Sequence, residues 1–326
     1  MKQNLNWAVL GTGVIANEMA QALQNMGKQL YAVGNRTYEK AVTFAETYNV
    51  PKVYDDFREM FTDPEVDVIY ITTPHNTHIE FLRMALKNHK HVLCEKSITL
   101  NSEELNEAVR LARDNQVILA EAMTIWHMPL YKKLWNIIES GELGNVQLLQ
   151  LNFGSFKEYN MENRFFNRNL AGGALLDIGV YALSLTRSFL RSQPDQILSQ
   201  VKFAPTGVDE QAGILLTNQQ GQMATLTLSL HSKQPKRAVI SCEKGYIEIL
   251  EYPRADKAVI VDAQTGERRE ITEGSTACAL QYEMQDMEQA ILTGNAEEMH
   301  LADTIDVMEM MTGLRQEWGL VYPEEM

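Results

Sequence analysis

The strongest constraint on the fold of this chain is a glycine-rich turn near its N-terminus, Gly11-Thr12-Gly13-Val14-Ile15-Ala16. The turn fits the pattern G-x-G-x-x-G/A and lies between a short apolar run and a stretch with helical spacing. In such a unit Gly11 permits a tight turn, Gly13 lets a pyrophosphate approach the backbone, and Ala16 allows close helix–strand packing. The N–H groups at the helix N-terminus favour the phosphates. We therefore predict a dinucleotide site; the alternative is a glycine turn that holds no ligand.

Strand and helix patterns alternate over residues 1–122. Short apolar runs at residues 6–10, 30–33, 66–72, 91–94 and 117–120 predict strands, and stretches with helical spacing lie between them. Asn101 and Glu104 have the spacing of a capping box at the start of one such helix. Because this alternation implies right-handed crossovers, we predict an α/β Rossmann domain with a doubly wound parallel sheet over residues 1–122.

The pattern changes in residues 123–326. A helix that begins at Pro129, a strand over 146–153 and a helix that begins after Gly172-Gly173 are followed by six strand-like runs between 197 and 261. Helices are predicted at 280–292 and 302–318. This order is typical of an α+β domain with a largely antiparallel open sheet. Strict alternation over 223–230 leaves one face of that sheet exposed, either as a dimer surface or as a solvated face.

Composition narrows the class of protein. Asp plus Glu is 43 and Lys plus Arg is 29, and the resulting net charge of −14 disfavours nucleic acid and anionic membranes as partners. The N-terminal residues lead into an apolar run that is too short for a signal peptide, and no later apolar run is long enough to span a membrane. The three cysteines form no Cys-x-x-Cys pair and suit a reducing compartment. We therefore predict a cytoplasmic protein.

The residues after the second predicted strand discriminate between cofactors. An NAD site usually has a carboxylate about twenty residues beyond the glycines, which binds the ribose hydroxyls. Here the segment is Asn35-Arg36-Thr37, and the first acidic residue is Glu39. Arg36 can pair with a 2′-phosphate, to which Asn35 and Thr37 can donate hydrogen bonds. We predict NADP rather than NAD; the alternative is a solvated arginine on a loop.

Further motifs follow in an order that resembles one family. Two of them end later strands of the first domain, and one lies in the second domain: Thr72-Thr73-Pro74-His75-Asn76-Thr77-His78, Cys94-Glu95-Lys96-Ser97 and Gly172-Gly173-Ala174-Leu175-Leu176-Asp177-Ile178-Gly179-Val180-Tyr181. With the glycine turn and Asn-Arg-Thr, they resemble the glucose–fructose oxidoreductase/inositol dehydrogenase/rhizopine catabolism (Gfo/Idh/MocA) family over nearly the whole chain. The motifs look most like the branch with dimeric dihydrodiol dehydrogenase, NADP-dependent D-xylose dehydrogenase and glucose–fructose oxidoreductase.

The resemblance implies roles for individual residues. It makes Lys96 the catalytic lysine beside the nicotinamide, puts Glu95 at the ribose and nicotinamide, and gives the cofactor loop the residues Thr73, Pro74, Asn76 and His78. It also implies homodimers or homotetramers built through the sheet of the second domain. The family usually has a proline where this chain has Ser97. If that proline is commonly cis, a serine adopts the bond only at a cost of about 2.5–4 kcal/mol.

Three other residues are candidates for the pocket. Trp126 can stack on the nicotinamide or on a sugar, although a tryptophan is more commonly a core residue. Arg164 precedes the glycine pair and either reaches a substrate or cofactor oxygen or remains at the surface, and Tyr159 lies on the same loop.

Four histidines lie close in sequence, His75, His78, His89 and His91. No acidic or cysteine partner completes a set of metal-ligand spacings around them, so we predict no metal site.

Hydride transfer at a carbinol carbon needs a group that takes the hydroxyl proton, a donor to the developing alkoxide and a dry pocket. A lysine beside the cationic oxidised nicotinamide loses its proton more readily, so Lys96 can accept the hydroxyl proton and return it in the reverse direction. Asp177 and Tyr181 are four residues apart and would share one helix face. Tyr181 can donate to the same oxygen, and Asp177 can hold a substrate hydroxyl. Taken alone, the pair also fits an ordinary core helix.

Three functions stay open at this point. The first is an NADP-dependent oxidoreductase that acts on a sugar, polyol or cyclic diol, or on the matching carbonyl. The second, motivated by Ser97, is a non-catalytic NADP-binding sensor. The third is an enzyme that recycles its bound cofactor within one turnover, with no net redox change.

Overall fold

The computed structural model describes residues 4–326, which form two compact units. The first unit comprises the chain up to Met123 together with 278–301, and the second comprises 124–277 and 302–326. The division falls where the sequence pattern changes, but residues 278–301, which the sequence prediction gives to the second domain, group with the first. Residues 1–3, which enter the signal-peptide prediction, lie outside the described residues.

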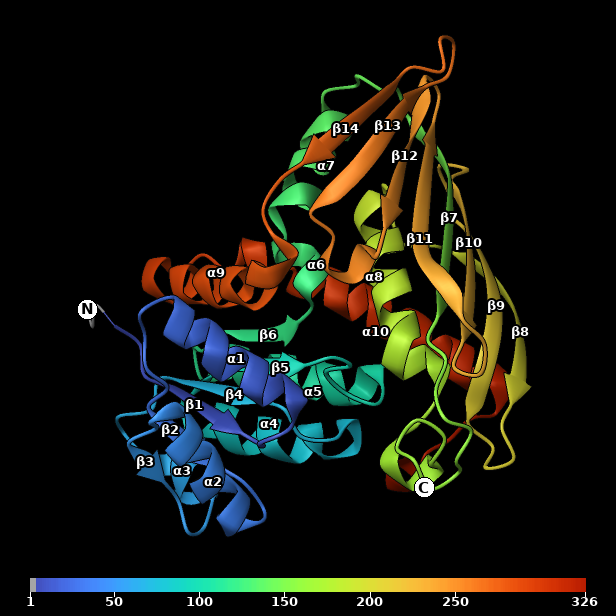
Figure 1. Ribbon diagram of the computed structural model, residues 1–326. Helices are drawn as coiled ribbons and strands as arrows, with labels where there is room; N and C mark the ends of the chain where they lie inside the picture. The colour runs from blue at the N-terminus through green and yellow to red at the C-terminus, as the bar shows by residue number, and fades with distance from the viewer. Residues whose placement is uncertain (1–3) are drawn as a thin grey trace. The chain divides into compact units, whose positions relative to one another are not determined.

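The first unit is built on a parallel sheet with the strand order β3-β2-β1-β4-β5-β6 (Figure 1). Each strand is joined to the next along the chain by a helical crossover or connection, so the predicted doubly wound α/β fold is confirmed. Its strands are β1 (Trp7–Leu10), β2 (Ala32–Gly34), β3 (Lys52–Val53), β4 (Val68–Ile71), β5 (His91–Glu95) and β6 (Leu119–Ala122). Its helices are α1 (Val14–Asn25), α2 (Tyr38–Tyr48), α3 (Glu59–Thr62), α4 (His78–Lys87), α5 (Ser102–Asp114) and α9 (Ala279–Thr293).

One core of the first unit lies under α1, α2 and α9. Met284 and Met287 of α9 are buried in the same cluster as Trp7 and Val9 of β1. The ring N–H of Trp7 also donates to Glu288 (3.0 Å). This packing is the physical reason why the α9 segment groups with the first unit rather than with its neighbours in sequence. On the other face α4 packs against α5.

The buried carboxylate of Asp63 connects side chains from the segments around β2 and β3, at the edge of this sheet. It accepts hydrogen bonds from Lys52 (2.6 Å), Tyr54 (2.6 Å) and Tyr31 (3.2 Å). Burial opposes its charge, but the hydrogen bonds from Lys52 and Tyr54 outweigh that cost and hold the pKa of Asp63 below its usual range. A lowered pKa contributes stability that is complete above the unfolded pKa, about 3.9, and is lost as the pH falls below it.

We therefore expect Asp63→Asn to destabilise the protein by about 1.5–3 kcal/mol at pH 7, the range for hydrogen bonds to a charged group. The difference from wild type should shrink as the pH falls below about 4, because the Asp63 carboxylate of the unfolded chain then binds a proton while the folded one is still ionised. Urea unfolding at a series of pH values measures both effects, with the exposed Asp114→Asn as a control. An equal loss for both variants contradicts the expectation.

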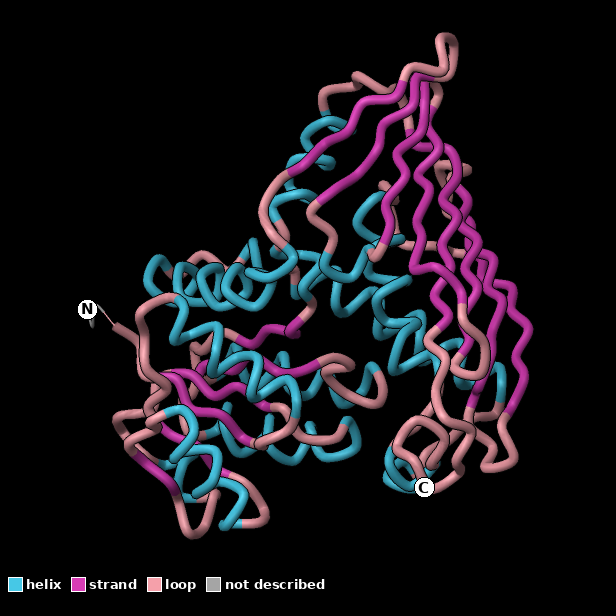
Figure 2. The backbone as a smooth tube through the Cα atoms, viewed as in Figure 1, coloured by secondary structure: helices cyan, strands magenta, loops and turns pink. Residues whose placement is uncertain are grey.

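The second unit is built on an eight-stranded sheet with the order β14-β13-β12-β11-β7-β10-β9-β8, whose strands are labelled in Figure 1 and coloured magenta in Figure 2. Its neighbouring strands are antiparallel except β7 and β10, which confirms the predicted, largely antiparallel α+β fold. The strands are β7 (Val146–Gly154), β8 (Gln196–Phe203), β9 (Asp209–Thr217), β10 (Met223–Ser229), β11 (Gln234–Cys242), β12 (Gly245–Leu250), β13 (Lys257–Asp262) and β14 (Arg268–Thr272). The helices are α6 (Thr124–His127), α7 (Pro129–Glu139), α8 (Val180–Phe189) and α10 (Leu301–Trp318).

The two faces of this second sheet differ. Alternate residues, such as Leu149 and Leu151 of β7 and Leu226 and Leu228 of β10, are buried on the face that α8 and the other helices cover. The opposite face keeps exposed positions such as Met223, as the alternation predicts. The segment 168–189, which includes α8, is long and apolar enough to cross a membrane by length and composition, but 83% of its apolar window is buried inside the protein. It is therefore accounted for as a core segment.

Candidate functional site

The predicted glycine turn connects β1 to α1 at the carboxyl edge of the parallel sheet. The Gly11 N–H donates to the Gly34 carbonyl (2.8 Å), so the turn lies beside the end of β2. Gly11 has a φ of +111°, and a Cβ there would lie 2.5 Å from Oγ1 of Thr72, which follows β4. Both the backbone conformation and the close approach of Thr72 thus require glycine.

Gly13 has a different reason to be glycine. Its φ of −74° is open to any residue, and a Cβ built on it would meet no protein atom within 4 Å. Packing within the protein therefore does not select glycine at this position, whereas close approach of a phosphate to the backbone does. Gly13 is the N-cap of α1 and offers no side-chain cap, so the first N–H groups of α1 are left for an anion. The turn fits a dinucleotide pyrophosphate.

The predicted 2′-phosphate segment begins directly after β2. Asn35 Nδ2 donates to the Thr37 carbonyl (2.9 Å), which shapes the start of α2. Arg36 and Thr37 are exposed, and within residues 4–326 the Arg36 guanidinium forms no ion pair or hydrogen bond. The Thr37 side chain forms no cap hydrogen bond to α2, so its hydroxyl does not have the capping role that its position suggests. The segment presents a cation and a hydroxyl near the glycine turn.

Lys96 follows the last residue of β5, in a segment that its neighbours hold closely. Tyr70 of β4 donates to the Glu95 carboxylate, and the Lys96 N–H donates to the same carboxylate (3.3 Å). On the other side the buried Glu121 of β6 accepts from the Ile98 N–H (3.0 Å). Neither Tyr70 nor Glu121 was identifiable from the sequence as part of the site, because Tyr70 lies inside the predicted strand 66–72 and Glu121 directly follows the predicted strand 117–120 without belonging to a motif. Lys96 itself is only partly buried.

His78 links the two predicted cofactor loops. Its ring is fully buried at the start of α4, with Nε2 2.8 Å from the Thr73 carbonyl and Nδ1 3.0 Å from the Ser97 carbonyl. Burial lowers the pKa of His78, so a neutral ring donates to one of these two carbonyls. The His78 ring thus connects the loop after β4 to the segment after β5, and its role in the cofactor loop stays a prediction. The Lys96–Ser97 peptide bond that it supports is cis.

The remaining predicted residues of the cofactor loop lie close to His78 in the sequence. Thr73 and Thr77 share a hydrogen bond between their hydroxyls (2.8 Å), and Thr77 also donates to the Pro74 carbonyl (2.7 Å). Pro74 is exposed and Asn76 is partly buried in the short helical turn His75–Thr77. These residues lie at the same sheet edge as the glycine turn, because β1 and β4 are parallel neighbours.

Asp177 and Tyr181 lie in the second unit. Asp177 belongs to a π-helical turn, Leu175–Gly179, and Tyr181 to α8, which follows at once. This differs from the single α-helix that the sequence predicts, and such turns are frequent at functional sites. Asp177 is 8% exposed and lies 3.7 Å from the guanidinium of Arg164, whose side chain is 60% exposed. The Tyr181 ring packs against Phe153 of β7, with centroids 6.1 Å apart.

The glycine pair before this segment is required by close packing. A Cβ on Gly172 would lie 2.6 Å from the Arg164 carbonyl oxygen. Gly173 has a φ of +132°, and a Cβ there would lie 2.1 Å from Oδ1 of Asp209. The pair therefore joins the Arg164 loop to the start of the helical segment that bears Asp177.

Trp126 and Tyr159 both have close protein contacts. Trp126 of α6 is fully buried, which agrees with the core alternative, and its stacking on a ligand stays a prediction. Tyr159 stacks on His231 (centroids 3.8 Å, 4° between planes) and donates to Glu210 (2.7 Å). In the part of the chain that the structure describes, no three His, Cys, Asp or Glu side chains gather as metal ligands. The His91 Nδ1 instead accepts from the Ile118 N–H (3.0 Å).

Two family models match the chain. One, the oxidoreductase family with an NAD-binding Rossmann fold, matches residues 5–123, and the other, the GFO/IDH/MocA C-terminal domain, matches residues 131–248. A trans-1,2-dihydrobenzene-1,2-diol dehydrogenase from Xenopus laevis is 31% identical over 97% of this chain and 99% of its own length. The protein of the same name from Homo sapiens is 32% identical over 76% of this chain and 74% of its own length.

Solved structures share the fold at low identity. Levoglucosan dehydrogenase in complex with NADH has a TM-score of 0.89 at 18% identity, over 97% of both chains. A 3-ketoreductase from Actinomadura kijaniata in complex with NADP and TDP-benzene has a TM-score of 0.86 at 20% identity, over 96% of this chain and 98% of its own.

Proposed function

We propose, from the premise that this chain belongs to the Gfo/Idh/MocA family of NAD(P)-binding oxidoreductases, that it is an NADP-dependent enzyme acting on the CH–OH group of a sugar, polyol or cyclic diol, or on the matching carbonyl. The observation that carries the proposal is the position of Lys96 at the carboxyl edge of the parallel sheet, the edge that also bears the glycine turn. In doubly wound sheets ligands bind at this edge.

The proposed roles follow from the chemistry of each side chain. When bound, the dinucleotide supplies or accepts the hydride. Lys96 takes the proton from the substrate hydroxyl as the carbonyl forms, and returns it in reduction. Tyr181 donates a hydrogen bond to the same oxygen, and Asp177 accepts one from a neighbouring substrate hydroxyl. Arg164, whose guanidinium lies 3.7 Å from Asp177, pairs with that carboxylate and holds it in place. The proposal requires that Lys96 and Tyr181 meet at one substrate carbon.

The cofactor preference is the finer part of the proposal. Two observations support NADP: Arg36 has no protein partner among the described residues, and no acidic residue lies between the end of β2 and Glu39. A cytoplasmic location, which the three unpaired cysteines support, completes the proposal.

A substrate screen tests the function directly. The purified protein is incubated with NADP⁺ and with aldoses, cyclic polyols and trans-diols, and with NADPH and the matching carbonyls, while nicotinamide absorbance is followed. We expect net redox turnover with at least one class. Tight cofactor binding without turnover on any class would instead favour a sensor, and conversion of a sugar without net redox change would favour an enzyme that recycles its cofactor.

We also propose that the exposed face of the second sheet joins two or four copies of the chain. Leu148 of β7 and Met223 of β10 are paired across the sheet and are each 39% exposed on that face. A charged side chain in place of Leu148 should dissociate the oligomer, because it would be buried in the interface between the subunits without a charged partner. Light scattering is expected to show a dimer or tetramer for wild type and for the control Leu292→Glu, and a smaller species for Leu148→Glu. A monomeric wild type contradicts the proposal.

A further inference from the structure

The most unusual buried group in the second unit is the carboxylate of Asp209, the first residue of β9. Asp209 is fully buried, and its Oδ2 accepts a hydrogen bond from the Leu175 N–H (2.6 Å). Its Oδ1 has no hydrogen-bond partner within the described residues. Leu175 begins the π-helical turn that carries Asp177. A carboxylate from a distant strand therefore caps the start of the helical segment that bears Asp177 and Tyr181.

The glycine pair leaves the space that this cap occupies. The Cβ that any other residue would place at Gly173 falls 2.1 Å from Asp209 Oδ1 and 3.3 Å from the Tyr322 hydroxyl. The turn is held from a second side by the C-terminal segment, where the buried Tyr322 donates to the Gly172 carbonyl (2.7 Å). Asp209 and Tyr322 thus hold the two glycines between them.

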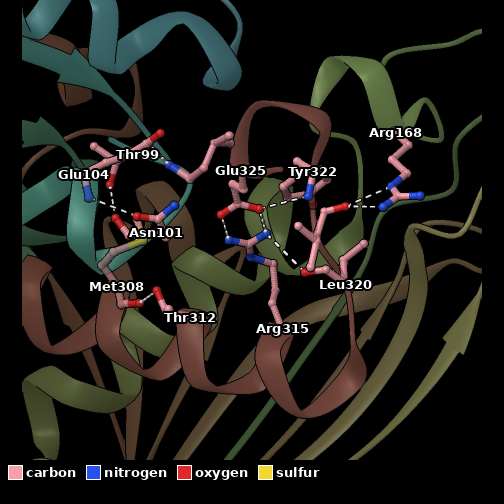
Figure 3. A network of polar contacts seen from close by, with 12 residues as sticks. Thr99, Asn101, Glu104, Arg168, Met308, Thr312, Arg315, Leu320, Tyr322 and Glu325 are labelled. Carbon is pink, nitrogen blue, oxygen red and sulfur yellow. Dashed lines mark hydrogen bonds and ion pairs between the residues drawn. The ribbon is translucent and has the colours of Figure 1, made fainter.

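The C-terminal segment is itself fixed by one ion pair and several hydrogen bonds, as Figure 3 shows. Arg315 of α10 is 3% exposed and makes two hydrogen bonds to Glu325 (2.7 and 2.8 Å). Its guanidinium lies over the Tyr322 ring, 4.7 Å from the centroid. Arg168, which precedes the glycine pair, donates to the Val321 carbonyl (2.9 Å). These contacts keep the Tyr322 hydroxyl in position on the turn.

We propose that Asp209 is a positioning residue, which acts through the Leu175 N–H to set the placement of Asp177 and Tyr181, with Tyr322 as its counterpart on the Gly172 carbonyl. The inference rests on the proposed function, since it concerns the same two side chains. Because Asp209 is buried, it does not touch the substrate, and its effect is on geometry alone. Small errors in the placement of reacting groups have large kinetic consequences.

The charge of Asp209 is kept at a cost in stability. Burial raises the pKa of Asp209 to about 7, against the opposing effects of the Leu175 N–H and of Arg315. The other ionisable group near the carboxylate is Tyr322, whose pKa burial raises well above its ordinary value. A folded pKa above the unfolded value means that this group's contribution to stability falls as the pH rises from about 4 to 7. Ionisation of Asp209 at this buried position therefore costs stability, which is not expected of a residue whose role is stability alone.

The test is the isosteric variant Asp209→Asn, with the exposed Asp195→Asn as its matched control. We expect kcat to fall by about tenfold to a hundredfold at pH 8, with the Kd for NADPH unchanged, because the proposed cofactor-binding residues at the sheet edge lie in the first unit. The melting temperature at pH 8 should stay within about 2 °C of wild type or rise. A loss of kcat that only parallels a lower melting temperature overturns the proposal.

A second readout does not depend on turnover. Amide hydrogen exchange of peptides covering residues 173–181, corrected for intrinsic rates, reports local openings in which Asp209 stays buried. It is expected to speed up in wild type as the pH falls through about 7, because a protonated Asp209 accepts a weaker hydrogen bond from the Leu175 N–H. Asp209→Asn should show the faster exchange at every pH, and Tyr322→Phe should show faster exchange with the wild-type pH dependence retained. Protection that is identical in wild type and Asp209→Asn overturns the positioning role. If the exchange results hold but no variant, including wild type, turns over any alcohol, the proposed function fails and the positioning of the segment stands.

Discussion

Replacing Lys96 by methionine is expected to lower kcat by about 10²–10⁴-fold, the usual contribution of one positioned general acid or base. Methionine keeps much of the length and apolar stem of lysine and removes the ammonium group, so the variant isolates the proton-transfer role. The segment around Lys96 is held by groups that this change leaves intact, namely the His78 and Glu121 contacts to Ser97 and Ile98. The fold and the binding of the cofactor should therefore persist.

Three measurements separate this role from a structural one. Steady-state kinetics on the substrate found in the screen gives kcat, fluorescence titration gives the Kd for NADPH, and thermal unfolding reports the fold. The exposed Lys87→Met on α4 serves as the control and should match wild type in all three. If Lys96→Met retains turnover within about tenfold of wild type, Lys96 is not the group that moves the proton.

The sequence predicts this fold well where elements are long and periodic. The alternating apolar runs of the first unit correspond to β1, β2, β4, β5 and β6. Asn101 caps α5 as predicted, since its side chain accepts from the Glu104 N–H (2.9 Å), while the Glu104 carboxylate accepts from the Leu100 N–H (3.0 Å). Elements with too few residues to show a period are missed, such as β3 with two residues and α6 with four. β14 is missed for another reason: its sequence RREIT shows almost no apolar alternation, because only Ile271 is buried.

Long-range packing explains the other differences. The grouping of α9 with the first unit depends on contacts of Met284 and Met287 with the core around Trp7, and no local pattern carries that information. The π-helical turn that contains Asp177 likewise has a distant contact, because Asp209 of β9, 34 residues from Leu175, accepts the hydrogen bond of the Leu175 N–H.

The candidate site shows the same division between local and distant information. Motifs are sufficient to identify the glycine turn, Lys96 and the Gly172–Gly173 pair, because each has a sequence signature tied to a strand or helix end. The role of an individual histidine or tryptophan side chain cannot be predicted from a motif in this way. His78 faces two carbonyls and Trp126 lies in the core, and both outcomes are set by burial rather than by position in a motif.

Removing the side chain of Arg36 is expected to change which dinucleotide the protein prefers. A charge-assisted hydrogen-bonded pair contributes about 1.5–3 kcal/mol, which corresponds to a loss of about 10–150-fold in affinity. Because the proposed partner of Arg36 is the 2′-phosphate, Arg36→Ala should weaken the binding of NADPH by this factor and leave the Kd for NADH nearly unchanged. Arg36 is exposed and forms no ion pair within residues 4–326, so its removal leaves no buried charge without a partner.

A second substitution tests the same segment in the opposite direction. Asn35→Asp introduces a carboxylate directly after β2, where it can accept hydrogen bonds from the ribose hydroxyls and repel a 2′-phosphate. It should lower the Kd for NADH and raise that for NADPH, and the double variant with Arg36→Ala should prefer NADH. Arg58→Ala, an exposed arginine of the same unit, is the control and should alter neither value. Tighter binding of NADH than of NADPH by the wild-type protein, or equal weakening of both by Arg36→Ala, contradicts the assignment, because only a contact with the 2′-phosphate can separate the two cofactors.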